Sequence, residues 1–408
     1  MHVCVLGAGI VGLATAYELR HRGMDVTVVD QGQPGSGASG GNGAQLSYSY
    51  VQPLADASIW QQLPHLMLSP SSPLKLKLQW DIHQWRWLVE FLQACNRSTS
   101  EHSTRQLLTL AALSRQRFEA MRQAEQMACD FSSTGKLVLY DTPAGLEAAR
   151  RQLQLQAPWG SPQQVVTAQQ CVDIEPALAH HQRHIAGAIY TPSECAADCL
   201  AVCQGLHRIL AARGVRFVLG ATVEGFERSG SHIAAVRTSA GTLEAQRFVL
   251  ALGSASQRVA SALGMRLPVY PLKGYSITVD TGDAPGPAPR VNVTDTARKM
   301  VFARIGQRLR VAGMAELVGH NTHIPPARIE RLRDAANAVF PGCSHFRELN
   351  PWTGMRPATP KGVPLVGHHP RAPGNLLLNT GHGALGFTLA FGTAAHIANM
   401  ADKVAPQA

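Results

Sequence analysis

The stretch Gly7-Ala8-Gly9-Ile10-Val11-Gly12, close to the amino terminus, decides the fold. An apolar run, His2 to Leu6, precedes it and is typical of a buried strand. The residues from Ile10 to Arg22 carry an apolar side at helical spacing and predict a helix. A glycine-rich turn between a strand and a helix is the fingerprint of a dinucleotide-binding unit in a parallel sheet.

The three glycines and one acid have separate roles in this fingerprint. Gly7 permits the tight turn, Gly9 lets the backbone approach a pyrophosphate, and Gly12 lets helix and strand pack closely. Asp30 lies 23 residues after Gly7, at the end of a second predicted strand, Val26 to Val29. Its carboxylate can accept hydrogen bonds from ribose hydroxyls and would repel a 2′-phosphate, so NADP is disfavoured. The loop by itself does not separate FAD from NAD.

Composition limits the class of protein. The chain has 408 residues, of which 45% are hydrophobic and 16% charged, which suggests two domains of ordinary globular character. The formal charge of +10 favours anionic partners, but no long run of lysine and arginine predicts nucleic-acid binding. The sequence contains no run of about 20 apolar residues, so no membrane-spanning helix is predicted.

The eight cysteines form no Cys-x-x-Cys pair, so no metal centre is expected, and reduced thiols suit a cytoplasmic protein. Cys195, Cys199 and Cys203 are spaced to share one helical face. Histidines such as His180 and His368 have no convincing metal-binding companions in the sequence.

The order of predicted elements favours a mixed α/β chain in which two domains are interleaved. Residues 58–129 are predicted to be helical, with a loop near Ser69 to Pro73. One apolar face is expected at Trp85, Leu88, Val89, Leu92 and Cys95, and another at Leu107, Leu110, Ala111, Phe118 and Met121. Strands at Val269 to Val279 and Leu309 to Met314 are expected in a second, antiparallel sheet. We predict that residues 1–50, 195–264 and 352–408 form a Rossmann-type nucleotide domain, and that residues 51–194 and 265–351 form a substrate domain.

Beyond the loop, the chain resembles the D-amino-acid dehydrogenase branch of the D-amino-acid oxidase and glycine oxidase superfamily. Four further segments carry the resemblance along nearly the whole chain. They are Ser39 to Leu46, Pro268-Val269-Tyr270-Pro271-Leu272-Lys273-Gly274-Tyr275-Ser276, Val311 to Glu316, and Trp352 to Pro357 together with Asn379 to Gly386.

The resemblance implies FAD, oxidation of an amino acid at its α-carbon, and electron transfer to a quinone or another acceptor that is not oxygen. The expected FAD contacts are Val5, Leu6, Gly7, Ala8, Gly9, Ile10, Val11, Gly12, Asp30, Gln31, Ser39, Asn42, Gly43, Ala44, Gln45, Leu46, Val223, Ala251, Leu252, Gly253, Gly354, Arg356, Gly381, His382, Gly383, Ala384, Leu385, Gly386, Phe387 and Thr388. The glycines from Gly381 to Gly386 would let backbone amides and a helix start face an anionic reduced flavin.

Candidate catalytic residues follow from the need to hold a carboxylate. Arg356 offers a guanidinium fork that binds a carboxylate by two hydrogen bonds, although a structural ion pair is its alternative. Tyr275, Tyr48 and Tyr50 are rival phenolic donors, each with a core role as the alternative. Thr191-Pro192-Ser193-Glu194, Tyr48-Ser49-Tyr50, Ala384 and Phe387 depart from the usual motifs of the family, so the resemblance does not extend to a preference for D-alanine.

Three functions remain open at this stage. The leading one is an FAD-dependent D-amino-acid dehydrogenase, which includes D-proline or hydroxyproline as substrates. An oxygen-using oxidase of the glycine or sarcosine type is the first alternative. A non-catalytic flavin-binding electron-transfer partner is the alternative from another class.

The segment from Lys75 to Phe91 suggests peripheral contact with the inner face of the plasma membrane. Lys75, Lys77 and Arg86 supply positive charge among Trp80, Trp85 and Trp87, a combination suited to anionic lipid headgroups. The alternative is that these tryptophans pack into the substrate domain.

Overall fold

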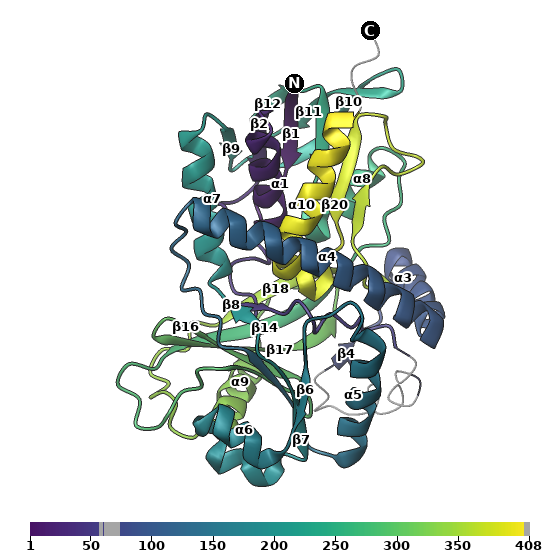
Figure 1. The fold of residues 1–408 in the computed structure, drawn as a ribbon. Helices are drawn as coiled ribbons and strands as arrows, with labels where there is room; N and C mark the ends of the chain where they lie inside the picture. Colours follow the sequence, from purple (N-terminus) through teal and green to yellow (C-terminus); the bar gives the residue numbers. More distant parts are fainter. Residues whose placement is uncertain (57–59, 61–73, 404–408) are drawn as a thin grey trace.

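The computed structural model describes residues 1–56, 60 and 74–403, and the loop predicted near Ser69 to Pro73 lies outside these ranges. Two layers of structure are stacked, with a nucleotide-type sheet above and a larger sheet below (Figure 1). The chain passes between the layers several times, because each sheet takes strands from distant parts of the sequence.

The upper sheet has six strands in the order β19-β20-β13-β1-β2-β9. All neighbouring pairs are parallel except β19 with β20. The strands are β1 (His2–Leu6), β2 (Asp25–Asp30), β9 (Arg216–Leu219), β13 (Arg247–Leu250), β19 (Leu365–Gly367) and β20 (Leu376–Thr380). The predicted strand–helix–strand unit at the amino terminus is therefore confirmed.

Alternation along β1 separates two cores. Val3 and Val5 face a cluster shared with helices, whereas Cys4 and Leu6 face a cluster shared with a three-stranded sheet. That sheet consists of β10 (Val223–Ser229), β11 (His232–Thr238) and β12 (Gly241–Glu244). Both faces of β1 are therefore covered. A parallel sheet of apolar strands requires this, because both of its faces are hydrophobic.

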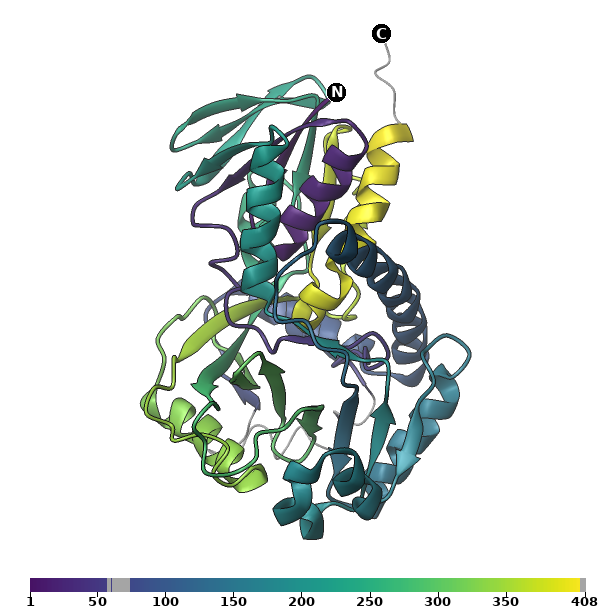
Figure 2. The ribbon, with the colours of Figure 1, turned by 60° about the vertical axis from the view of Figure 1, so that its left-hand side comes forward.

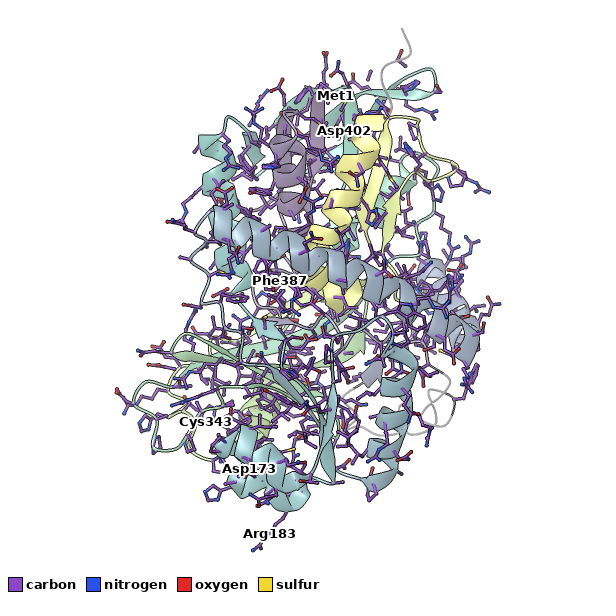
Figure 3. All side chains as sticks on the ribbon, in the orientation of Figure 1. Met1, Asp173, Arg183, Cys343, Phe387 and Asp402 are labelled. Carbon is purple, nitrogen blue, oxygen red and sulfur yellow. The ribbon has the colours of Figure 1, made fainter. Side chains whose placement is uncertain are left out.

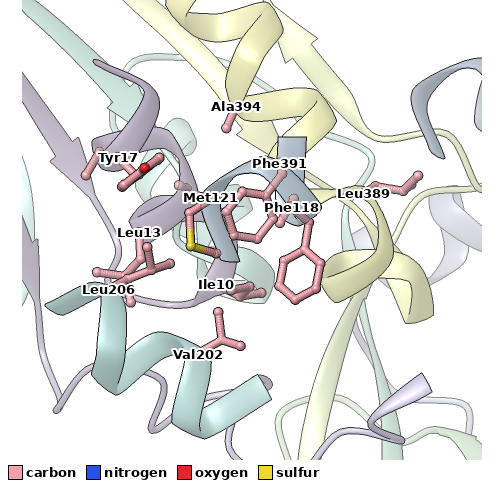
Figure 4. Packing of buried hydrophobic residues seen from close by; sticks show 14 of the residues in the cluster. Ile10, Leu13, Tyr17, Phe118, Met121, Val202, Leu206, Leu389, Phe391 and Ala394 are labelled. Carbon is pink, nitrogen blue, oxygen red and sulfur yellow. The ribbon is translucent and has the colours of Figure 1, made fainter. Parts of the chain in front are cut away.

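The helical layer joins four segments that are far apart in sequence. These helices are α1 (Ile10–His21), α4 (Arg97–Ala124), α7 (Cys199–Ala212) and α10 (Gly386–Lys403). Figure 4 shows Leu13 and Tyr17 of α1, Phe118 of α4, Leu206 of α7 and Phe391 of α10 in one cluster. The predicted apolar face on α4 is confirmed, since Leu107, Ala111, Phe118 and Met121 are buried.

The lower sheet has nine strands. Their order is β18-β14-β17-β16-β15-β5-β7-β6, and β4 pairs with β17. The strands are β4 (Leu74–Leu76), β5 (Lys136–Tyr140), β6 (Gln164–Val166), β7 (Gly187–Thr191), β14 (Tyr270–Asp280), β15 (Asn292–Asp295), β16 (Met300–Ile305), β17 (Arg308–Leu317) and β18 (Trp352–Ala358). The sheet is mixed rather than antiparallel as expected, because β15 pairs with β5 and β17 with β4 in parallel.

The remaining elements surround the lower sheet, connect the layers or, for the short helix of residues 256–261, pack within the upper layer (Figures 1 and 2). They are β3 (Gln45–Leu46), which pairs with β8 (Cys195–Ala196), the helices α3 (Ile82–Ala94), α5 (Pro143–Gln156), α6 (Ala168–Ile174), α8 (Ser256–Ser261) and α9 (Pro326–Val339), and the 3-10 turns η1 (Pro176–His184), η2 (Gly253–Ala255) and η3 (Gly383–Leu385). Residues 352–358, which the predicted division assigns to the nucleotide domain, pair with β14 of the lower sheet.

Three predictions about elements are wrong. Residues 74–76 form strand β4 instead of helix. On α3 the predicted face is misplaced, since Trp85 and Val89 are exposed while Trp87 is buried against β14. Cys195 belongs to β8 and not to a helix, because Asp198 caps the helix that starts at Cys199.

Candidate active site

The glycines of the amino-terminal loop are required for different reasons. Gly7 has a φ of +120°, and a side chain on it would collide with the carbonyl oxygen of Ala251. A side chain on Gly12 would collide with the carbonyl of Gly7. On Gly9, by contrast, a Cβ would meet nothing nearer than Ser39 Oγ at 3.5 Å. The fold therefore demands glycine at positions 7 and 12, whereas position 9 leaves room for a ligand at the start of α1.

Asp30 and Ser39 hold the same turn together. Asp30 Oδ2 accepts a hydrogen bond from Ala8 N at 2.7 Å, and Oδ1 accepts one from Gly32 N at 2.8 Å. Ser39 Oγ accepts one from Ile10 N at 3.1 Å. Each Asp30 oxygen keeps a second acceptor position, and the side chain is partly exposed. Asp30 is thus oriented to accept further hydrogen bonds from a sugar.

The segment 39–46 fastens the loop to the lower sheet. Ser276 Oγ donates to the carbonyl of Gly41 at 2.6 Å, and Arg310 Nη1 donates to that of Asn42 at 2.7 Å. Gln45 Nε2 donates to the carbonyls of Val293 and Phe302. A nucleotide held by the upper layer would therefore extend directly onto the lower sheet.

The carboxyl-terminal glycine segment lies on the same side. Gly381 and Gly383 have φ angles of +82° and +56°, and α10 then begins at Gly386. Both α1 and α10 begin at the end of the upper layer that faces the lower sheet (Figure 1). Two helix starts, each a source of unpaired amides and partial positive charge, suit a bound diphosphate and an electron-rich ring.

His382, inside this segment, is a structural residue. Its ring is buried and Nε2 lies 3.0 Å from Thr393 Oγ1. Burial lowers the pKa of His382 to about 3, so the imidazole is neutral at physiological pH. Phe387, labelled in Figure 3, is also structural, since its ring meets Phe118 edge-on at 5.8 Å. The expected flavin contacts of these two residues can therefore come only from their backbones.

The other expected FAD contacts occupy the ends of neighbouring strands. Ala251 to Gly253 follow β13, with Ala251 N bonded to Leu6 O, and Val223 begins β10. Thr388 Oγ1 accepts a hydrogen bond from Ser47 N at 3.3 Å. These positions are compatible with a dinucleotide, and their roles remain predictions.

Arg356 is a half-buried cation with uncommitted donors. It lies on β18 opposite Leu272 of β14, and protein surrounds its guanidinium. Nη1 donates to Met314 O at 2.8 Å, and within the described ranges no carboxylate forms an ion pair with it. Burial lowers its pKa to about 10, which leaves it charged at neutral pH. The remaining fork can accept a carboxylate.

Two features prepare the position of Arg356. A side chain on Gly274 would collide with the guanidinium, so glycine is needed there for the arginine to lie across β14. Met314 has a φ of +60° beside a register shift between β14 and β17. A left-handed non-glycine residue costs roughly 1 kcal/mol or more and often marks a functional site. Gly274 stands in a quoted motif, but neither role was predicted.

Tyr275 is directed away from Arg356, and the expectation that it contacts substrate stays a prediction. It lies on the opposite face of β14 from Leu272 and Ser276, buried among residues of α9. Its hydroxyl donates to Glu316 Oε2 at 2.7 Å, and Glu316 forms an ion pair with Arg328 at 2.5 Å. Side chains alternate between the two faces of β14, but the sequence does not show which face α9 covers. In the structure Tyr275 lies on the covered face, in the core.

Tyr48 and Tyr50 point to different surroundings. Tyr48 is buried in the helical core, and burial raises its pKa far above the usual range. Tyr50 is 36% exposed, and its ring lies over Lys136 Nζ at 4.4 Å. Buried Glu194 accepts 2.7 Å hydrogen bonds from Tyr48 N and Ser49 N and so fixes this segment. Tyr50 is the phenol that stays available to a ligand.

Lys136 was not predicted. It begins β5, is 2% exposed, and donates to Ser47 Oγ at 2.7 Å. Its position within an apolar strand gave no signal, because burial of a lysine is unusual without a tertiary partner. Among residues 1–56, 60 and 74–403, no cluster of three metal-ligating side chains occurs.

Comparisons with known proteins agree with this geometry. The model of the DAO family of FAD dependent oxidoreductases matches residues 2–400. The chain therefore belongs to that family, and it is an FAD-dependent oxidoreductase, as the resemblance implied. The free space at Gly9 and the unpaired backbone amides at the starts of α1 and α10 fit such a cofactor.

The names of individual relatives are more specific than the family description. The chain is similar to "D-amino acid dehydrogenase 2" of Ralstonia nicotianae, with 44% identity over 100% of this chain and 97% of that protein. A protein of the same name from Pseudomonas aeruginosa is 42% identical, covering 99% and 95%.

The chain is also similar to solved structures, and at their low sequence identity this similarity concerns the fold only. Glycine oxidase from Geobacillus kaustophilus has a TM-score of 0.77 at 22% identity, covering 99% of this chain and 95% of that one. L-proline dehydrogenase from P. horikoshii has a TM-score of 0.74 at 16% identity, covering 98% and 93%. The predicted mixed α/β architecture is confirmed.

Proposed function

We propose that this protein is a D-amino-acid dehydrogenase that removes hydride from the α-carbon of its substrate. The observation that carries the proposal is Arg356, a half-buried guanidinium with donors to spare on the sheet face that meets the flavin loop. The names of the relatives at 44% and 42% identity support the same substrate class.

Bound FAD would supply the hydride acceptor, and its diphosphate would lie at Gly7 to Gly12, with Asp30 at the ribose. Arg356 binds the α-carboxylate by its fork and thereby orients the α-carbon. His382 is neutral and buried, so it does not act as a base. The imine product then hydrolyses to a 2-oxo acid and ammonia.

Anaerobic reduction of the purified yellow protein by a panel of amino acids tests the proposal. We expect D-amino acids to bleach the flavin absorbance and L-amino acids to leave it unchanged. Bleaching by glycine and sarcosine alone, with peroxide formed in air, would identify the oxidase alternative. Absence of bleaching by any amino acid would identify a non-catalytic flavin protein.

The loop assignment has its own test in Gly9→Val. Because no protein atom blocks a side chain at this position, the variant should fold but lose FAD. Gly12→Val is the matched control that should fail to fold, since its side chain meets the Gly7 carbonyl. Normal flavin content in a folded Gly9→Val protein would refute the assignment.

We further propose that electrons leave to a quinone and that the segment 75–91 contacts an anionic membrane on the cytoplasmic side. Trp80 is fully exposed, and Ile82, Trp85 and Val89 are 59%, 44% and 53% exposed. Lys75, Lys77 and Arg86 are exposed beside them. Trp87 differs, since it is buried and its Nε1 donates to Ala358 O.

Three basic residues contribute on the order of 3 kcal/mol of attraction to an anionic surface. No helix within the described ranges is long and apolar enough to cross a membrane, so any contact through this segment would be peripheral. Flotation with anionic vesicles at low salt should recover the protein. Replacing Lys75, Lys77 and Arg86 by Gln should abolish flotation, whereas replacing Arg216, Arg228 and Arg237, which are also exposed, should not. Equal flotation of both triple variants would refute this anchor.

A further inference from the structure

Strand β18 carries Arg356 and is attached at both ends to segments expected to bind FAD. Its first residue, Trp352, contacts Gly41 in the flavin loop, residues 39–46. Its last residue, Ala358, forms a β-bridge with His382 of the carboxyl-terminal glycine segment. The distance between the expected carboxylate anchor and the flavin therefore depends on how β18 meets these two segments.

The indole of Trp352 fills the space between the flavin loop and the sheet. A Cβ atom built on Gly41 would lie 2.5 Å from Cγ and 2.9 Å from Cε3 of the indole. One built on Gly354 would lie 2.5 Å from Cζ2 and 2.9 Å from Cζ3, at the far edge of the same ring system. Such distances are too short for real Cβ atoms, so both positions require glycine. The backbones of the loop and of the strand thus both contact the indole directly.

Strand pairing explains the orientation of Trp352. It lies directly opposite Ser276 of β14, so the two side chains share one face of the sheet. Ser276 Oγ donates a hydrogen bond to Gly41 O at 2.6 Å. This bond holds the loop toward the sheet, whereas the indole keeps the two apart. Together they set the height of the loop above the sheet.

The indole also lies beside the guanidinium of Arg356. Gly354 and Gly274 are directly paired, and a Cβ atom on Gly274 would lie 2.6 Å from Cζ of Arg356. Since directly opposite Cβ positions are about 5 Å apart, the indole and the guanidinium lie within about 10 Å of each other. Two residues without side chains therefore form a common floor for the two groups.

The chemistry of an indole suits a spacer. The ring system is rigid and its side chain has only two rotatable bonds, and it has no group that binds a carboxylate. A substrate held on Arg356 meets a flavin held by the loop, so a change in their separation displaces the α-carbon from the flavin. A misplacement of about 1 Å can lower a rate about 100-fold.

We infer that Trp352 is a positioning residue, a rigid spacer that sets the distance between the flavin loop and the Arg356 guanidinium. The inference rests on the proposed function, in which Arg356 binds the α-carboxylate and FAD accepts the hydride. Because Trp352 does not itself bind the carboxylate, its removal should slow flavin reduction while substrate affinity is retained.

The first test measures anaerobic flavin reduction in Trp352→Leu with the D-amino acid that reduces the wild-type protein fastest. We expect the limiting rate constant to fall about 100-fold, because the loop settles toward the sheet. The dissociation constant from the same titration should change less than about threefold, because the Arg356 fork is retained. Trp352→Phe keeps a flat ring, and its rate constant should fall less than about 10-fold.

Phe340→Leu is the matched control, because it also replaces an aromatic ring packed on this sheet by leucine. Phe340 is buried on the opposite face, where its ring lies 5.2 Å from that of Phe302. This variant should melt at a lower temperature, with a reduction rate constant close to that of the wild type. Visible circular dichroism of the bound flavin, which depends on its surroundings, should change in Trp352→Leu and not in Phe340→Leu.

A double-mutant cycle tests the contact itself. Gly354→Ala adds a methyl group that collides with the indole, so the rate constant should fall at least about 10-fold. In the Trp352→Leu background the same substitution should cost less than about twofold, because the ring that it meets is absent. Additive losses would show that Gly354 acts independently of Trp352 and would overturn the spacer.

The outcomes separate this inference from the proposed function. If no D-amino acid reduces the wild-type flavin, the proposed function is overturned, and the circular dichroism still shows whether Trp352 sets the loop. A loss confined to the dissociation constant, equal rate losses in Trp352→Leu and Phe340→Leu, or unchanged circular dichroism in Trp352→Leu would overturn the spacer. If Trp352→Leu does not retain FAD, Trp352→Phe provides the same comparison.

Discussion

The two faces of the nine-stranded sheet use the same residue types in opposite ways. On the face under α9, Tyr275 is bonded to Glu316 and Lys273 to His323 O, so their polar groups have partners. On the face toward the flavin loop, Arg356 has one hydrogen bond and no described ion pair, whereas Lys136 donates one hydrogen bond and interacts electrostatically with buried Glu194. Satisfied polar groups stabilise a fold, whereas buried groups with spare donors indicate a binding site.

The largest effect should come from Arg356. Arg356→Met removes the fork and should lower kcat/KM for D-amino acids about 10³-fold, and Arg356→Lys about 10²-fold, because lysine keeps the charge but loses bidentate geometry. Flavin content, measured from the absorbance released on denaturation, should be normal in both. Unchanged kinetics in Arg356→Met would move the carboxylate site elsewhere.

The pH dependence of the free energy of unfolding should reveal the lowered pKa of buried Lys136. Burial lowers its pKa from 10.5 to about 8 in the folded protein. Between pH 8 and 10.5 the unfolded chain therefore binds more protons at this residue, so its contribution to stability rises with pH, by about 3 kcal/mol in total. Urea unfolding at a series of pH values measures this. The rise attributable to Lys136 should be missing in Lys136→Met, and identical pH profiles would show that the lysine is not desolvated.

Gly274→Ala should displace the guanidinium without touching substrate. The added methyl collides with Arg356, which must move, and kcat/KM should fall about 10-fold. Gly225→Ala is a matched control, since its methyl would lie 2.8 Å from the guanidinium of Arg237 on the three-stranded sheet. A loss of activity equal in both variants would point to general destabilisation.

The smallest effect on catalysis should come from Tyr275→Phe. Loss of its bond to buried Glu316 should lower the free energy of unfolding by about 1 to 2 kcal/mol, while kcat/KM changes less than twofold. Thermal melting and steady-state kinetics on the same preparation decide this. A tenfold kinetic loss at unchanged stability would restore Tyr275 to the substrate site.

These contrasts show which predictions a linear sequence supports. The Gly7 to Gly12 turn, helix α1 and strand β2 were predictable within about two residues at either end, because their signals are local. Strand β4 was not, since residues 74–76 pair with β17, about 240 residues away. The apolar face of α3 was misassigned because Trp87 packs against Tyr270 and Leu272 of β14, about 180 residues further along the chain.

The sequence by itself determined the nucleotide loop, the family and Arg356 as a candidate anchor. In each case a short stretch of sequence contains the residues that matter, as a glycine turn or as a charged side chain, and needs no distant partner to be identified. Only the tertiary structure decided that Tyr275 lies in the core under α9 and that Lys136 is buried on the opposite face of the sheet. Both lie on alternating strands, and the direction in which a strand residue points depends on what covers each face of the sheet. That covering comes from α9 on one side and from the 41–50 segment on the other, and neither is adjacent in the sequence to β14 or to β5.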